Sequence, residues 1–140
     1  MAADIPSDQG PDPFVIDIER ATLANKNYRT TVWTGDNLQM TLMSIEPGGD
    51  IGLEVHHTHD QFLRVEAGRG RVQMGPEKDD LPFDREVEAD WVILVPAGSW
   101  HNVTNIGDEP LKLYALYGPP EHPHGAVHPT KADADAAEHH

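Results

Sequence analysis

The chain has 140 residues, 24 acidic against 10 basic side chains, a formal net charge of −14 and no cysteine. One domain is typical of this length, and the lack of cysteine excludes disulfides, thiolate metal sites and cysteine nucleophiles. The acidic charge argues against partners that are recognised through Lys and Arg, namely nucleic acid and anionic membrane surfaces. The N-terminus is polar and no apolar run approaches membrane-spanning length, so we expect a cytoplasmic protein.

The elements predicted in chain order are mostly short strands. Residues 1–13 are rich in Pro, Asp and Gly and predict a flexible N-terminal arm. A short helix or turn is expected over 19–25. Strands are predicted where β-branched and aromatic residues gather or where polarity alternates, namely over 29–33, 38–45, 51–56, 61–67, 71–74, 85–95 (one bent strand or a pair) and 111–117. A short helix is expected over 131–138.

Glycine and proline clusters separate these strands, among them Pro47-Gly48-Gly49 and Pro96-Ala97-Gly98. Many short strands with little helix predict an all-β fold, an antiparallel sandwich or barrel. We therefore predict one barrel domain over 14–118. An irregular, His-rich tail follows over 119–140.

Side chains able to bind metal gather in two stretches of the sequence. Glu54 and His56 are two residues apart, so on a strand they point to the same face. A four-residue connection leads to Gln61, which in a hairpin would lie beside His56. His101 follows a Pro-x-Gly turn and would reach the same patch from another strand. This mixture of nitrogen and oxygen donors suits one divalent transition metal, such as Fe, Mn, Zn, Ni or Co.

The first stretch resembles a signature motif of the cupin superfamily. That motif reads Gly, five residues, His-x-His, three or four residues, Glu, six residues, Gly. Here the corresponding residues are Gly48, Glu54, His56, Gln61 and Gly68, with the spacing kept throughout. Glu54 stands in place of the first His, and Gln61 stands in place of the Glu.

The second stretch resembles the other cupin motif, which reads Gly, five residues, Pro-x-Gly-x-x-His, three residues, Asn. In this chain Pro96, Gly98, His101 and Asn105 match it, and Asp90 replaces the leading Gly. Two motifs in the right order are more specific than either alone. The resemblance implies an antiparallel double-stranded β-helix, that is, a jelly-roll or cupin barrel.

The resemblance also implies what the barrel does. Glu54, His56, Gln61 and His101 would hold a divalent metal, and a small molecule would bind inside the barrel. A metal-dependent enzyme could then perform an oxygenation, an isomerisation or a cyclisation, with Glu54 as the catalytic base. A non-catalytic binding or sensing module is the alternative hypothesis, and a purely structural barrel is a third. Single-domain cupins often pair, so we expect a homodimer formed through the strand over 29–33 or the N-terminal arm.

Five further residues are candidates for the pocket or a lid. Pairing His57 with His59 as ligands leaves only one residue before Gln61, too short a link for a hairpin. We therefore expect both to lie exposed in the turn, with at most a secondary role. Trp100 precedes His101 and is a candidate for the pocket mouth. His122 and His124, in the His-rich tail, favour packing first and a lid second.

Overall fold

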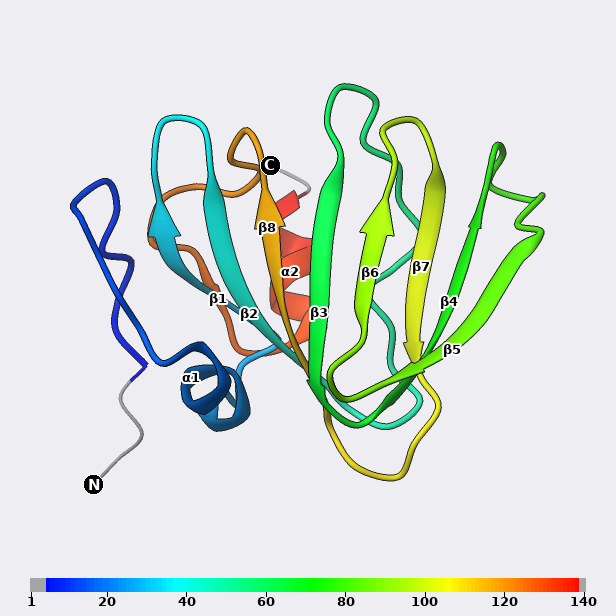
Figure 1. The fold of residues 1–140 in the computed structure, drawn as a ribbon, viewed down its shortest axis with the longest axis horizontal. Coiled ribbons are helices and arrows are strands. Elements are labelled where there is room, and N and C mark those ends of the chain that lie inside the picture. The colour runs from blue at the N-terminus through cyan, green and yellow to red at the C-terminus, as the bar shows by residue number, and fades with distance from the viewer. Residues whose placement is uncertain (1–4, 139–140) are drawn as a thin grey trace.

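Two antiparallel sheets face each other in this computed structural model, which describes residues 5–138 (Figure 1). The larger sheet has the strand order β6-β3-β8-β2-β1-β9 and the smaller one has the order β5-β4-β7. In chain order the strands are β1 (Arg29–Thr34), β2 (Gln39–Ile45), β3 (Gln61–Ala67), β4 (Arg69–Gly75), β5 (Phe83–Glu88), β6 (Val92–Val95), β7 (Trp100–Asn105), β8 (Leu111–Tyr117) and β9 (Val127–His128). The two helices are α1 (Ile18–Ala24) and α2 (Lys131–Glu138). The predictions of an all-β fold and of both helices are confirmed.

The interior between the sheets is apolar at one end and polar at the other, as the register of the larger sheet shows. At one end Ile45 pairs with Leu111, and both side chains are buried. At the other end Tyr117 lies between Gln39 and Gln61, and all three are buried. Because alternate residues of a strand face the same side, these polar residues point inward like the apolar ones below them. The apolar end forms the core, and the polar end is where a site can be built.

Helix α1 covers the outer face of the larger sheet. The Asp17 side chain caps it by accepting a hydrogen bond from the backbone nitrogen of Arg20 at 3.1 Å. Its Ala21 packs with Val32 of β1 and Leu42 of β2 in a second, smaller apolar cluster. The outward-facing side chains of these strands are therefore apolar as well, which is why they read as nearly continuous apolar or β-branched runs.

The segment after β8 returns to the barrel. Strand β9 pairs with the outer edge of β1, with His128 opposite Arg29. Ala134 of α2 is buried in the main core, and Lys131 forms an ion pair with Asp50. The backbone nitrogen of Thr31 donates to Ala126 O at 3.0 Å. The edge of β1 at Arg29 and Thr30 is thus paired with the chain's own tail, and the homodimer through this strand or the N-terminal arm stays a prediction.

The described part of the expected N-terminal arm makes specific contacts. The Asp8 carboxylate accepts hydrogen bonds from Thr34 Oγ1 and, at 2.9 Å, from the backbone nitrogen of Gly125. Trp33 Nε1 donates to Asp12 O at 2.7 Å. These contacts attach the N-terminal segment to β1 of the larger sheet and to the tail.

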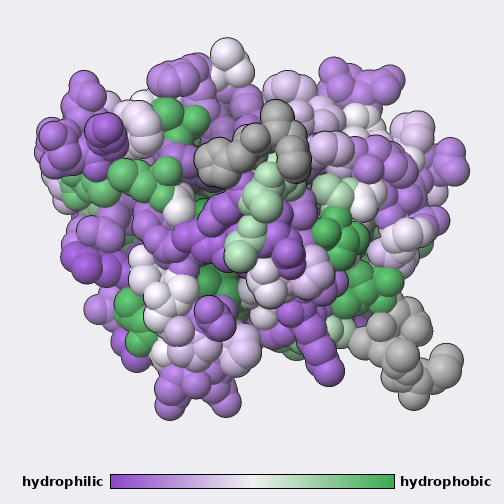
Figure 2. Space-filling model, turned by 180° about the vertical axis from the view of Figure 1, so that it is seen from behind, coloured by the Kyte–Doolittle hydropathy of each residue, from purple (hydrophilic) through white to green (hydrophobic). Residues whose placement is uncertain are grey.

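Most of the face opposite that of Figure 1 is hydrophilic, with apolar residues in small separate groups (Figure 2). This distribution agrees with the strong acidic charge of the chain. Neither helix within residues 5–138 is long and apolar enough to cross a membrane.

Asn105, the last residue of the second motif, has a structural role. Its Nδ2 donates to Ile45 O at 2.9 Å and to Glu109 O at 2.8 Å, and its Oδ1 accepts from the backbone nitrogen of Gly107 at 2.8 Å. The buried side chain thereby fixes the turn between β7 and β8 against the end of β2. The amide of Asn105 therefore stabilises the barrel through this turn and takes no part in the polar end of the interior.

We predict that Asn105→Ala lowers the free energy of unfolding by about 2–4 kcal/mol, because buried backbone groups lose their partners. Urea unfolding would measure the change. Asn37→Ala, in the exposed turn between β1 and β2, is the control and should change it little. Equal effects of the two substitutions would contradict this role of Asn105.

Candidate metal centre

The segment before β3 is positioned by backbone pairing with β7. The nitrogen of Glu54 donates to His101 O at 3.0 Å, and the nitrogen of His101 donates to Glu54 O at 2.9 Å. Our prediction of a strand over 51–56 is wrong, because Gly52 has a φ of 91° and leaves the extended conformation. Isolated bridges at Asp50 and Glu54 replace a continuous ladder. Glu54 therefore reaches His101 through a single two-way backbone bridge.

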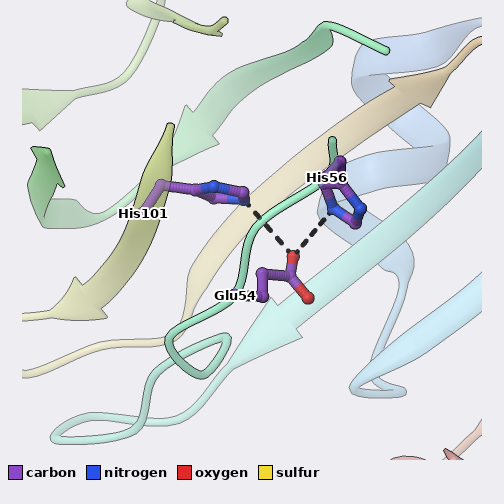
Figure 3. A group of neighbouring side chains, drawn as sticks. All are labelled: Glu54, His56 and His101. Carbon is purple, nitrogen blue, oxygen red and sulfur yellow. Dashed lines mark ion pairs between the residues drawn. The ribbon is translucent and has the colours of Figure 1, made fainter. Parts of the chain in front are cut away.

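Three side chains converge at this bridge (Figure 3). Glu54 Oε1 lies 3.4 Å from His56 Nε2 and 3.4 Å from His101 Nε2. The two imidazole rings have their centroids 5.5 Å apart. The ligand-capable atoms of all three residues lie within 4.8 Å of one another, a spacing compatible with one shared ion.

His101 is held in a defined orientation. Its side chain is fully buried, and its Nδ1 lies 3.0 Å from Ser99 O. A carbonyl oxygen only accepts hydrogen bonds, so Nδ1 carries the hydrogen. In the neutral ring Nε2 then presents its lone pair toward Glu54, which is the arrangement typical of a metal-binding histidine.

Gln61 is the first residue of β3, and the structure places it differently from the predicted hairpin. It pairs with Val95 of β6 and Tyr117 of β8, not with His56. The side chain is nevertheless buried and lies on the inward face, and its Oε1 has no hydrogen-bond partner among residues 5–138. The prediction that a hairpin places Gln61 directly beside His56 is therefore wrong. The amide of Gln61 nevertheless lies at the polar end of the interior.

The donor set fits a divalent metal ion. His56 Nε2, His101 Nε2 and Gln61 Oε1 are all buried, and within the described part of the chain none has a hydrogen-bond partner. A buried polar atom without a partner costs about 1–3 kcal/mol, so the two imidazole nitrogens beside the Glu54 carboxylate indicate a missing shared ligand. Two imidazoles, a carboxylate and an amide oxygen suit the first-row transition metals.

The electrostatics keep the carboxylate charged. Burial alone would raise the pKa of Glu54, but interaction with His101 and His56 lowers it to about 2. Interaction with Glu54 raises the pKa of His56 against the opposing effect of burial. An anion that persists at neutral pH between two imidazoles is what a cation site requires.

A second carboxylate faces the other nitrogen of His56. Glu121 Oε1 lies 3.3 Å from His56 Nδ1, and Glu121 Oε2 lies 3.8 Å from His59 Nε2. The rings of His56 and His59 stack with their centroids 4.9 Å apart. The expected exposure of His59 is wrong, because this stacking leaves its side chain only 9% exposed. His57 is exposed as expected. The group His56, His59 and Glu121 is therefore a second candidate for holding a metal ion.

Gln39 positions the tail residues that reach the site. Its Oε1 accepts from the backbone nitrogens of Glu121 at 3.0 Å and His122 at 2.9 Å, and its Nε2 donates to His122 O at 2.8 Å. The His122 ring stands edge-on to Tyr117 with centroids 5.2 Å apart. Burial is the main cause that lowers the pKa of His122 to about 3, so this ring is neutral at physiological pH.

Two of the other candidates lie away from the polar interior. Trp100 precedes the inward-facing His101 on β7, so its side chain lies on the opposite face of the strand. The side chain of His124 is 55% exposed and contacts Asp8 and Gly10 O. Their roles at a pocket or lid stay predictions.

Sequence reasoning missed three residues that the structure brings into this region. Tyr117 ends a predicted strand, and its inward position follows from the alternation of β8. Arg29 begins a predicted strand, where a charged residue is expected to face solvent, yet it is buried. Glu121 carries no local signal, since its place depends on the fold of the tail around Gln39.

Comparison with known proteins agrees with the fold and the motifs. The family model described as "Cupin domain" matches residues 41–117, and the chain belongs to this family. A relative is the uncharacterized protein YrkC of Bacillus subtilis (strain 168), 60% identical over 94% of this chain and 70% of that protein. The uncharacterized protein L612 of Acanthamoeba polyphaga mimivirus is 36% identical over 81% of this chain and 70% of that protein.

Among solved structures, the crystal structure of BH2720 from Bacillus halodurans superimposes with a TM-score of 0.92. It is 60% identical, and the match covers 94% of this chain and 99% of that one. The predicted resemblance to cupins and the predicted antiparallel double-stranded β-helix are confirmed. Cupins commonly bind metals and small molecules, so the cluster around Glu54 lies in a fold suited to both.

We predict that Gln39→Leu lowers the free energy of unfolding by about 2–4 kcal/mol, because it leaves buried backbone groups of the tail without partners. It should also shift the NMR signals of the His122 ring, since that ring depends on Gln39 for its position. Gln73→Leu on β4 is the control, a half-buried glutamine in the smaller sheet. Unchanged His122 signals in a folded Gln39→Leu protein would contradict the anchoring role.

Proposed function

We propose that this cupin binds one divalent transition-metal ion through Glu54, His56 and His101, with Gln61 as the fourth ligand. We propose further that it is a metal-dependent enzyme acting on a small organic molecule inside the barrel. The observation that carries the proposal is the position of Glu54 Oε1, 3.4 Å from each of two buried Nε2 atoms. Among the residues that the structure describes, neither nitrogen has a hydrogen-bond partner.

The group around Glu54 fits the ion better than the group around Glu121. His101 is fully buried and its Nδ1 is fixed by the backbone carbonyl of Ser99, whereas in the second group His59 Nδ1 contacts the exposed hydroxyl of Thr58 at 3.3 Å. Gln61 adds a further buried oxygen that has no hydrogen-bond partner among the described residues, at the polar end of the interior. The first group also occupies the positions that bind metal in the cupin motifs.

Glu121 has a supporting role in this proposal. When His56 binds through Nε2, its Nδ1–H donates to the Glu121 carboxylate, which lies 3.3 Å away. Such a carboxylate fixes the tautomer and orientation of the ring and makes the ligand more basic. The metal site would thus include a contribution from the C-terminal tail.

A bound divalent ion would supply Lewis-acid polarisation of a substrate carbonyl or hydroxyl group. The protein supplies the proton-transfer groups and excludes water. Glu54 is ionised and its side chain is about one-third exposed, 34%, so it would serve as the catalytic base when it leaves the ion as substrate binds. Tyr117 keeps its proton because burial raises its pKa, and it can donate a hydrogen bond. This combination suits isomerisation or cyclisation of a small molecule, and oxygenation would need dioxygen and a redox-active ion such as Fe in addition.

We predict that tag-free wild-type protein binds one transition-metal ion per chain and that His101→Gln abolishes stoichiometric binding. Elemental analysis by plasma mass spectrometry after loading with each candidate metal would measure this. His57→Gln, an exposed histidine in the same segment, should retain the metal. If His59→Gln removes the metal and His101→Gln does not, the ion belongs to the second group and this proposal fails.

We predict that Glu121→Gln weakens metal affinity by roughly 10–100-fold without abolishing binding, as the loss of a carboxylate that orients a ligand histidine does. Competition with a fluorescent chelator would give the dissociation constants. Glu46→Gln, an exposed carboxylate in the turn after β2, serves as the control. An affinity for the metal that Glu121→Gln leaves unchanged would exclude the supporting role of this carboxylate.

Catalysis is tested separately from binding. Metal-loaded protein incubated with a mixture of small metabolites should convert at least one of them, as detected by mass spectrometry. The His101→Gln protein should convert none. A compound that is retained by the wild-type protein but never altered would favour the non-catalytic binding or sensing function instead.

A further inference from the structure

A buried guanidinium group lies on the inward face of β1, outside the cluster around Glu54. Arg29 is 6% exposed, and its Nε has no hydrogen-bond partner within the described residues. The ion pairs that Arg and Lys make with described acidic side chains involve Arg64, Arg69, Arg71 and Lys131, and none involves Arg29. A buried charge without a counter-charge among the described residues is costly, so an anion bound at this position would be favourable.

The neighbours of Arg29 orient the guanidinium but do not neutralise it. Its Cζ lies 5.3 Å from the centroid of the Tyr28 ring, and its Nη1 lies 3.4 Å from His128 Nδ1. His128 is the residue directly opposite Arg29 in the pairing of β1 with β9. An aromatic face and an imidazole hold the side chain in place. Neither of them supplies the negative charge that a buried arginine requires.

A continuous wall of rings joins Arg29 to the candidate metal centre. From His128 the next ring is His122, with centroids 6.5 Å apart, then Tyr117 at 5.2 Å and His56 at 6.4 Å. The charges of Arg29 and Glu54 both act on His122, with Arg29 lowering its pKa and Glu54 raising it, after the larger effect of burial. The two charged groups therefore face one interior, from opposite ends of the same wall.

Other polar atoms along this wall lack partners as well. In the part of the chain that is described, His122 Nε2 and Gln61 Oε1 are buried without a hydrogen-bond partner, like Arg29 Nε. Unsatisfied buried groups are rare in folded proteins. Several of them around one interior indicate a polar occupant that spans from the arginine toward the metal group.

We propose that Arg29 binds the carboxylate of a small organic acid whose other end faces Glu54, His56 and His101. This inference rests on the proposed function, because it names the substrate class for that same site. A planar guanidinium matches a carboxylate with two parallel hydrogen bonds. The carboxylates of Glu54 and Glu121 on the same interior disfavour a doubly charged phosphate, so the ligand is a monoanionic carboxylate.

Isothermal titration of zinc-loaded protein with matched acids and amides tests the proposal. The probes are lactate, propionate and glycolate, each against its neutral amide. We expect at least one acid to bind the wild-type protein at least about tenfold more tightly than its amide. Arg29→Met should remove that preference, and Arg71→Met, which changes an exposed arginine paired with Asp84, should keep it. An acid preference that survives in Arg29→Met overturns the proposal, as does its absence for every probe in the wild type.

A measurement on the wild type covers the case in which Arg29→Met does not fold. The ¹⁵N resonance of Arg29 Nε should shift on addition of the binding acid and stay in place on addition of its amide. Its assignment follows from Arg29→Lys, which keeps the charge and removes that resonance. An Arg29 Nε signal that does not respond to any of the acids overturns the proposal.

The same titrations on metal-free protein separate this inference from the proposed function. If the protein takes up no metal but binds an acid through Arg29, the metal-dependent function is contradicted and the anion site is supported. If the protein binds stoichiometric metal but shows no preference for acids over amides, only the anion site is contradicted.

Discussion

The two backbone hydrogen bonds between Glu54 and His101 are the contact on which the candidate metal centre depends. They join the irregular segment before β3 to β7, two parts of the chain that are far apart in sequence. The carboxylate and both imidazoles are thereby held at one point without any continuous strand on the Glu54 side. Because the Glu54 side of the bridge is irregular, Gly52 can turn the chain so that Glu54 and His56 both reach inward.

The C-terminal tail belongs to the same site as the barrel strands. Through Gln39 it presents Glu121 to one nitrogen of His56 while Glu54 faces the other. Through β9 it places His128 against Arg29. The tail therefore contributes both a carboxylate and part of the polar wall, which explains why a histidine-rich extension is retained close to the barrel interior.

Much of the fold followed from the sequence because its signals are local. The alternation of β8 and the glycine-rich turns determine strands and their ends, and motif spacing located His101 and Gln61. The segment over 51–56 was mistaken for a strand, since its residue types suit one and only the conformation of Gly52 differs. Glu121 and Arg29 could not be found in this way. The burial of Arg29 and the position of Glu121 both result from packing of the tail on β1 and Gln39, and no local pattern records such a contact.

The charges of the interior fit together with the proposed metal and ligand. Glu54 and Glu121 contribute two carboxylates, and Arg29 contributes one buried guanidinium. His122 stays neutral because burial lowers its pKa to about 3. With a divalent cation bound, the two carboxylates, the guanidinium and the ion together would carry a net charge of about +1. A monoanionic ligand would neutralise that charge. An interior that needs both a cation and an anion to reach balance would bind neither partner as well alone as with the other, since each removes the electrostatic cost of burying its opposite. On this argument, metal and acid should bind cooperatively, and the cooperativity would arise from Arg29 and Glu54 acting across the same set of rings.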